Sequence, residues 1–226
     1  MRERYLHALA ELEAQIRDMG GLVKRAVHNA IWALEHNAPA FAHEIIAKDR
    51  AIDERRYAIE TAALDVIARQ QPLARDLRTV SAILDLASEL ERIGDYAEGI
   101  AKILLRCAAQ PALALPAPIP AMAAHAEAML HDALEALHNR DPEAAVRLER
   151  ADTSVDVLYI EVTAWAMQSM RKSPQTLERA MYYLWIAHNL ERIADRTVNI
   201  GERTTFIATG TLESKSAAAF EARRKG

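Results

Sequence analysis

The stretch Leu90-Glu91-Arg92-Ile93-Gly94-Asp95 recurs one hundred positions later as Leu190-Glu191-Arg192-Ile193-Ala194-Asp195. In both copies a glutamate and an aspartate stand four positions apart, the spacing that places two side chains on one face of an α-helix. Carboxylates held side by side repel each other, at a cost of about 0.2 to 0.5 kcal/mol on an exposed helix. The recurrence therefore predicts a helical repeat with an acidic site in each copy.

The composition of the 226-residue chain indicates an all-helical protein. Glycine is scarce, with seven residues, and aromatic residues make up only 5%. The abundant residues Ala, Leu, Glu and Arg are strong helix formers. The net charge of -4 provides no basic footprint for nucleic acid, so we expect no nucleic-acid partner.

The sequence favours a cytoplasmic location. The single Cys107 excludes an intramolecular disulfide and fits a reducing compartment. Residues 1–5 lack the apolar core of a signal peptide, and the weakly polar run 111–124 holds four prolines, which a membrane span does not tolerate. We expect no direct membrane insertion, and peripheral contact with the inner membrane only through partners.

Apolar residues recur at every third or fourth position along six segments, which predicts six long helices. The segments are 5–34, 39–70, 73–108, 122–138, 141–170 and 173–209. Gly20 and Gly21 weaken the first helix, but its apolar pattern continues in phase and predicts one helix. Gly210 is a suitable end for the last helix. Three antiparallel helices joined by tight turns form a bundle.

The repeat extends well beyond the acidic motif. Matched pairs stand at an offset of 103 or 100: Pro39 with Pro142, Asp49 with Asp152, Asp53 with Asp156, His28 with His131, and Leu77 with Leu177. The fold class is therefore predicted to be all-α, with two tandem, similar three-helix bundles. We place the first bundle at 1–109, a Pro-rich linker at 110–120, the second bundle at 121–210 and a flexible tail at 211–226.

Each half carries two acidic pairs with this four-residue spacing on two successive helices. The pairs are Asp49 with Asp53, Glu91 with Asp95, Asp152 with Asp156, and Glu191 with Asp195. They border the apolar stripes, and a carboxylate beside apolar surface must be protonated, paired with a base or bound to a metal. Sets of oxygen ligands favour hard cations such as Mg, Ca, Mn or ferric iron, and four carboxylates could bridge two or more ions.

Two other interpretations of these acids remain open. The acids could pair with arginines in a metal-free helical scaffold, the candidates being Arg50, Arg55, Arg56, Arg92 and Arg192. Alternatively, they could serve a metal-dependent phosphohydrolase or a redox-active bundle enzyme, which would need an open coordination position and a base. Because the sequence shows no Gly-rich phosphate loop, nucleophile elbow or cysteine cluster, we expect no enzymatic activity.

Histidines are weaker candidates for a metal site. His28 and His131 occupy matched positions, but we expect both to face solvent. Glu135 and His138 show the Glu-x-x-His spacing of di-iron bundles, a fold that needs a second copy of the motif, which this sequence lacks.

In these motifs the chain resembles the PhoU family of phosphate-transport accessory regulators. The resemblance runs from the first helix to Gly210. It rests on Asp49-x-x-Ile52-Asp53, on residues 69–78, and on the two acidic motifs, the second of which is followed by Asn199-Ile200. It implies two similar three-helix bundles, each with a multinuclear metal site of iron, zinc, manganese or magnesium. The implied ligands are Asp49, Asp53, Glu91, Asp95, Asp152, Asp156, Glu191 and Asp195.

The same resemblance implies a non-enzymatic adaptor that restrains high-affinity phosphate uptake and the phosphate-starvation response. The implied partners are the ATP-binding subunit of the phosphate ABC transporter, a membrane sensor histidine kinase, and a second copy of the chain in a homodimer. Two residues depart from the family pattern. Gly99 stands where the second copy has Asn199, and Arg196 stands where a smaller residue or histidine is common. We therefore expect the two sites to be unequal, with fewer ions in the first.

Overall fold

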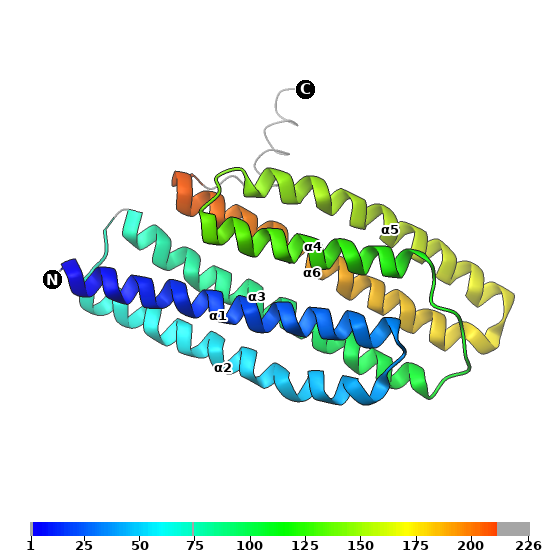
Figure 1. The fold of residues 1–226 in the computed structure, drawn as a ribbon. Helices are drawn as coiled ribbons and strands as arrows, with labels where there is room; N and C mark the ends of the chain where they lie inside the picture. The colour runs from blue at the N-terminus through cyan, green and yellow to red at the C-terminus, as the bar shows by residue number, and fades with distance from the viewer. Residues whose placement is uncertain (1, 74, 212–226) are drawn as a thin grey trace, which may run out of the picture.

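The structure is a computed structural model that describes residues 2–73 and 75–211 of the chain. It consists of long helices that lie nearly alongside one another in an elongated molecule (Figure 1). They are α1 (Arg2–Glu35), α2 (Pro39–Gln70), α3 (Arg75–Ala108), α4 (Pro118–Asn139), α5 (Ala144–Lys172) and α6 (Leu177–Thr209), with a short 3-10 turn, Pro174–Thr176, before α6. The all-α prediction is confirmed.

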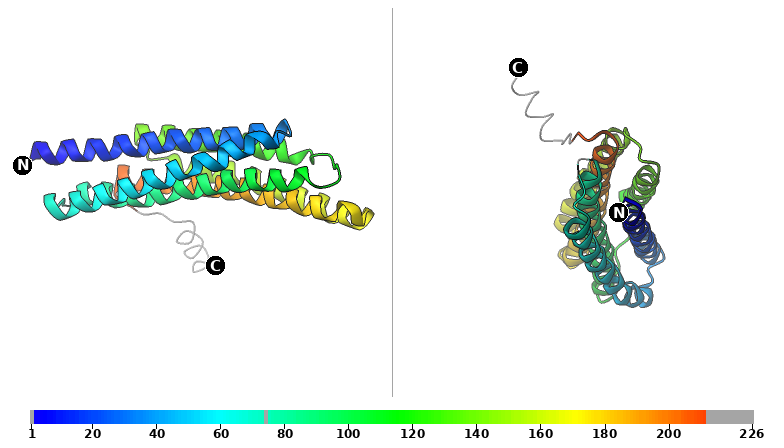
Figure 2. Two further views of the ribbon diagram at one scale, coloured as in Figure 1. Left: turned by 90° about the horizontal axis from the view of Figure 1, so that it is seen from below. Right: turned by 90° about the vertical axis from the view of Figure 1, so that its left-hand side faces the viewer.

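The helices form two similar groups of three. Helices α1, α2 and α3 pack on one another, as do α4, α5 and α6. The two groups meet through α3 against α6 and α1 against α4, and the views along and across the helices show them side by side (Figure 2). Because α3 and α6 carry the two acidic motifs, both motifs lie on helices at the centre of the molecule.

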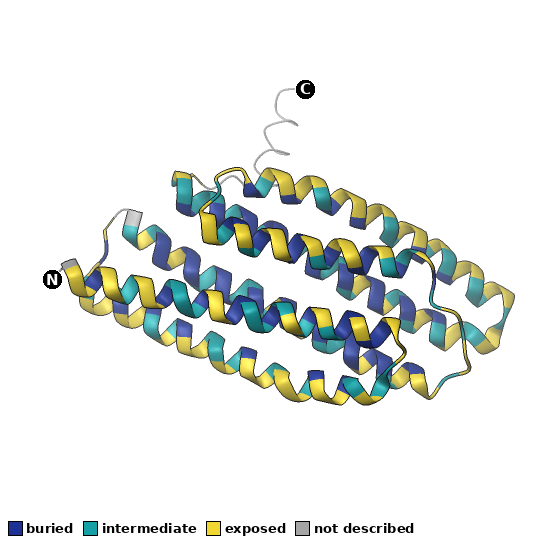
Figure 3. Cartoon of the chain, viewed as in Figure 1, coloured by how far each residue is buried: buried dark blue, intermediate teal, exposed yellow. Residues whose placement is uncertain are grey.

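Buried apolar residues flank each acidic motif. Leu90, Ile93, Leu190 and Ile193 are completely buried, and buried positions follow the inner faces of all the long helices (Figure 3). Removal of this apolar surface from water stabilises the bundle by roughly 1.5 to 3 kcal/mol for each large side chain. The same burial fixes the rotation of α3 and α6 about their axes, and so determines where the acids between these residues point.

The proline-rich linker is shorter than predicted. Pro118 and Pro120 lie in the first turn of α4, so the connection between α3 and α4 comprises residues 109–117. A proline in the first turn loses no hydrogen bond, because the N–H groups there have no partner within the helix. Prolines therefore mark the start of this helix as well as the extended chain before it.

Two side chains of α6 hold this connection against the second group of helices. Arg179 Nη1 donates hydrogen bonds to the carbonyl oxygens of Cys107, at 2.9 Å, and Gln110, at 3.2 Å. The hydroxyl of Tyr183 donates to the carbonyl oxygen of Leu113 at 2.8 Å. The connection is therefore bonded to the second bundle over several residues.

The helix ends agree with most of the expected boundaries. Helix α1 continues through Gly20 and Gly21, as predicted, and Gly210 ends α6 with a φ of 82°. Helix α6 begins at Leu177, after the 3-10 turn. Apart from Thr211, the predicted tail lies outside the described residues. Among the described helices, none is both long and apolar enough to cross a bilayer.

Gly201 allows α6 to approach the start of α5. A Cβ atom at this position would lie 2.8 Å from Leu148 Cδ1 and 3.1 Å from the backbone Cα of Ala145. Gly21, in α1, has space around it, since the nearest atom to an added Cβ is Arg25 Nη1 at 3.5 Å. The two glycines therefore differ in what they contribute to packing.

The substitution Gly201→Ala should destabilise the protein by about 1 to 3 kcal/mol, because the added methyl group meets backbone that cannot move aside. The matched change Gly21→Ala should stabilise it by about 0.5 to 1 kcal/mol, because alanine favours helix and meets no obstacle. Urea denaturation of both variants measures the difference. Equal effects would show that Gly201 is not a packing requirement.

Candidate functional site

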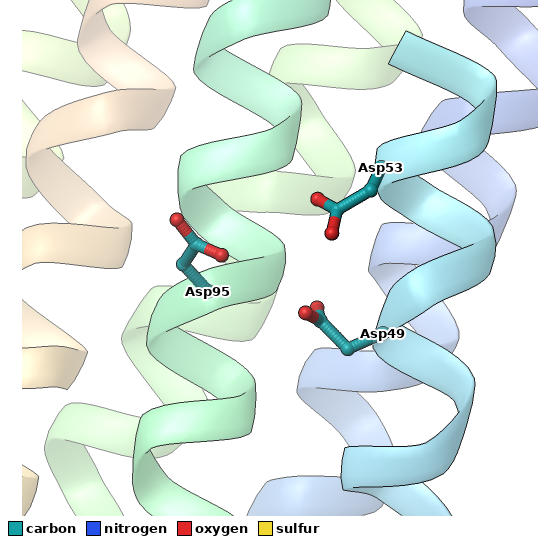
Figure 4. Close-up of side chains that lie close together, drawn as sticks. All are labelled: Asp49, Asp53 and Asp95. Atoms are coloured by element: carbon teal, nitrogen blue, oxygen red, sulfur yellow. The ribbon is translucent and has the colours of Figure 1, made fainter. Parts of the chain in front are cut away.

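Three of the predicted acids converge between α2 and α3. Asp49 and Asp53, one turn apart on α2, face Asp95 on α3 (Figure 4). One carboxylate oxygen from each lies within 4.8 Å of the others, and within the described part of the chain no other group of three or more His, Cys, Asp or Glu side chains meets this criterion. The spacing is suitable for a shared cation, so we name these three residues the acidic cluster.

Small and apolar residues bring the two helices together at the acidic cluster. A Cβ atom on Gly94 would lie 2.9 Å from Ile52 Cδ1 and 3.4 Å from Asp49 Oδ1. The absence of a side chain at Gly94 therefore lets Ile52, which is buried, pack closely against α3. This contact sets the distance across which the carboxylates face one another.

The surroundings of the acidic cluster oppose its negative charge. Burial raises the pKa of Asp49 to about 6, with further contributions from the charges of Glu98, Asp53 and Asp95. Burial and then the charge of Asp53 also raise the pKa of Asp95. Lys102 acts in the opposite direction on both carboxyls. Without a bound cation, folding therefore favours the protonated form of Asp49 and Asp95.

Glu91 and Glu98 lie at the margin of the acidic cluster. Glu91 accepts a hydrogen bond from Arg56 at 3.4 Å, and burial is the main cause that raises its pKa. Glu98 pairs with Lys102. Glu98 was not among the residues predicted from the sequence, although its position three residues after Asp95 and seven after Glu91 puts it on the same face of α3.

The four matched acids of the second bundle are arranged differently. Glu191 accepts two hydrogen bonds from Arg192, at 2.6 and 2.5 Å, and Asp195 accepts one from Arg192 at 3.2 Å. The bond to Glu191 raises the pKa of the Arg192 guanidinium above its ordinary value. Asp152 is buried and Asp156 is exposed. The structure therefore does not bring these acids together as a group of three or more.

The matched histidines lie at the contact between α1 and α4, away from the acids. His28 Nδ1 lies 2.7 Å from Glu127 Oε1, and His131 Nδ1 lies 3.1 Å from Lys24 Nζ. Both histidines are exposed, as predicted. Their matched positions reflect a repeated contact between the bundles.

The departure at Gly99 also concerns contact between the bundles. A Cβ atom on Gly99 would lie 3.0 Å from Asn189 Nδ2 of α6, so glycine makes room for this amide. At the matched position, Asn199 Nδ2 donates a hydrogen bond to Glu89 of α3 at 3.0 Å. The difference between Gly99 and Asn199 is therefore explained by packing between α3 and α6.

The fold and the acidic cluster define a class of protein: a tandem repeat of helical bundles with a carboxylate site suited to a hard cation. The sequence profile of the PhoU domain matches residues 16–104 and 119–204, one match in each bundle. The chain therefore belongs to the PhoU family.

Curated relatives agree over most of the chain. The phosphate-specific transport system accessory protein PhoU of Edwardsiella tarda is 35% identical over 204 residues, which is 89% of this chain and 84% of that protein. The protein of the same name from Escherichia coli K12 is 34% identical, over 89% of this chain and 85% of its own length.

Solved structures share the fold. The phosphate transport system regulatory protein PhoU from Streptococcus pneumoniae superposes with a TM-score of 0.86 at 31% identity, covering 93% of this chain and 99% of that one. PhoU from Pseudomonas aeruginosa gives a TM-score of 0.87 at 27% identity, covering 92% and 100%. Both similarities extend over the two bundles together.

The raised pKa of Asp49 predicts how stability depends on pH in metal-free protein. Folding raises this pKa from 3.8 to about 6. The contribution of the Asp49 carboxyl to the free energy of unfolding is therefore fully present below pH 3.8 and is lost as the pH rises through about 6. Asp49→Asn removes this loss. In chelator, we expect the variant to be more stable by about 1 kcal/mol near pH 7.5, after allowance for solvent screening, and to lose this advantage near pH 4.

Urea denaturation at the two pH values measures this effect. The control is Asp65→Asn, which changes an exposed aspartate on α2 paired with Arg69 at 3.3 Å, and should alter stability by at most about 0.5 kcal/mol at either pH. Destabilisation by Asp49→Asn in metal-free protein at neutral pH would contradict the electrostatic account of the acidic cluster.

Proposed function

We propose that this protein is an accessory regulator of phosphate-specific transport that acts by binding partners and not by catalysis. The support is its membership of the PhoU family and the names of relatives that match it over 89% of the chain. We extend the proposal to negative regulation of phosphate uptake and of the phosphate-starvation response. The proposed partners are the ATP-binding subunit of the phosphate transporter and a membrane sensor histidine kinase, with the protein acting as a homodimer.

We also propose that the acidic cluster binds a hard cation. The observation that supports this most is the convergence of Asp49, Asp53 and Asp95 within 4.8 Å at the contact of α2 with α3. Three carboxylates supply oxygen ligands only, which suits Mg, Mn or ferric iron better than metals that prefer thiolates. Glu91 and Glu98 lie close enough to influence the cluster electrostatically and would extend the ligand set if more than one ion binds.

The cation would contribute structure to the adaptor. It would supply positive charge where burial and mutual repulsion raise the pKa of two carboxyls, and it would tie α2 to α3. The surface of the first bundle would then hold one shape for its partners. This role requires no substrate and no general base.

Cation binding can be measured with Mn²⁺ added to protein purified in chelator. A ligand that binds only the folded state at about 100 times its Kd stabilises that state by about 2.7 kcal/mol, so Mn²⁺ should raise the Tm. Asp53→Asn combined with Asp95→Asn should abolish this rise, whereas Asp65→Asn on the exposed face of α2 should preserve it. An equal rise in all three proteins would refute a specific site in the acidic cluster.

The adaptor proposal predicts capture of the transporter ATP-binding subunit. Tagged protein should recover this subunit from cells grown with and without phosphate, and metal removal or Asp53→Asn should reduce recovery if the cation shapes the docking surface. Purified protein should not hydrolyse a generic phosphate ester. Turnover that disappears in Glu91→Ala would favour a phosphohydrolase and contradict the proposal.

A further inference from the structure

We infer that the two bundles have diverged in function: arginine side chains neutralise Glu191 and Asp195 in the second bundle, and the cation site is confined to the first. The inference rests on the cation binding proposed above for the acidic cluster. It reverses the expectation from sequence that the first site would hold fewer ions. Residues at matched positions in the two copies provide the argument.

The first difference is the position of the additional acid on the central helix of each bundle. Glu98 contributes to the negative charge around the acidic cluster, and its matched residue in the second bundle is the buried Val198. The neighbouring Lys102, which pairs with Glu98, is matched by Glu202. In the second bundle the additional acid therefore stands one turn further along the helix, at Glu202, and the lysine of the first bundle has no counterpart.

The second difference is the source of positive charge. In the first bundle, Arg56 of α2 reaches across to Glu91 at 3.4 Å. Its matched residue is Tyr159, which supplies no charge. Glu191 instead accepts two hydrogen bonds from Arg192 on its own helix. The matched Arg92 is exposed.

The geometry of Arg192 explains why it competes with a cation. Its guanidinium bonds to both oxygens of Glu191 and to Asp195 Oδ2, so one side chain occupies oxygens from both acids of the motif. Such paired charge-assisted hydrogen bonds are among the strongest that proteins make. A metal ion would have to displace them before it could use the same oxygens.

Arg196 adds a second guanidinium that is held in place from the other bundle. Its Nη2 lies 3.8 Å from Asp195 Oδ2, and its Nη1 lies 3.3 Å from Glu89 Oε2 of α3. Both Arg196 and Glu89 are more than four-fifths buried, with side-chain exposures of 17% and 18%. Because this ion pair joins the bundles, movement of Arg196 away from the acids would disrupt contact between α3 and α6.

The third difference is the packing that sets the distance between the helices. Gly94 packs closely on Ile52 in the first bundle. The matched residues are Ala194 and Val155, both buried, so a methyl group has been gained on α6 and one lost on α5. The contact that brings the carboxylates of the first bundle together therefore has a different composition in the second.

The inference is tested by counting Mn²⁺ bound per chain in equilibrium dialysis. The two double variants are matched, Asp53→Asn with Asp95→Asn in the first bundle and Asp156→Asn with Asp195→Asn in the second. We expect the second-bundle variant to bind as much Mn²⁺ as the unchanged protein, and the first-bundle variant to bind at least about tenfold more weakly. Binding that survives in the first-bundle variant, or is lost equally in both, would overturn the inference.

A second experiment looks for a gain of Mn²⁺ binding in the second bundle, and it does not depend on the acidic cluster of the first. In the Asp53→Asn, Asp95→Asn background, Arg192→Gln should release Glu191 and Asp195, so that Mn²⁺ raises the Tm. The same background with Arg92→Gln, the matched and exposed arginine, should gain no such response. Arg192→Gln is preferred to a change at Arg196 because it leaves the ion pair with Glu89 intact.

The two experiments distinguish failure of this inference from failure of the cation binding on which it rests. If the unchanged protein binds no Mn²⁺, cation binding by the acidic cluster fails. In that case an Mn²⁺-dependent rise in Tm on Arg192→Gln still supports neutralisation by arginine, and the absence of a rise overturns it. Circular dichroism of each variant checks that the helices remain folded.

Discussion

The arrangement of the acids depends on burial of the apolar residues between them. Leu90 and Ile93 are completely buried, which fixes the rotation of α3 and directs Asp95 towards α2. The apolar burial stabilises the bundle enough to tolerate carboxylates that repel one another and are partly removed from water. Where Gly94 allows close packing, this constraint produces the acidic cluster.

The same constraint acts on both halves with different results. Leu190 and Ile193 are buried like their counterparts, but Glu191 and Asp195 are bonded to Arg192 and do not form a cluster with the acids of α5. In the first bundle, therefore, three carboxylates face one another. In the second bundle, Glu191 and Asp195 are bonded to a guanidinium group instead. Fold similarity to PhoU structures extends over both halves.

Much of the fold followed from the sequence, because apolar periodicity and the repeat are local patterns. These patterns predicted the six helices, the continuity of α1 through Gly20 and Gly21, and the end of α6 at Gly210. They also placed Asp49, Asp53 and Asp95 on facing helix surfaces. The pairing of Glu191 with Arg192 was not predictable in this way, because it depends on rotamers. The position of Pro118 was ambiguous because proline is common both in extended chain and in a first helical turn.

Helix α3 contacts both its own bundle and the second bundle. One face carries Asp95 towards α2, and another carries Glu89 to Arg196 and Asn199 of α6. Its ends are continuous with the rest of the chain, and Arg179 bonds the segment that follows it to the second bundle. A displacement of α3 relative to α2 would consequently also change the contacts of α3 with α6, so one helix couples the geometry of the acidic cluster to the contact between the bundles.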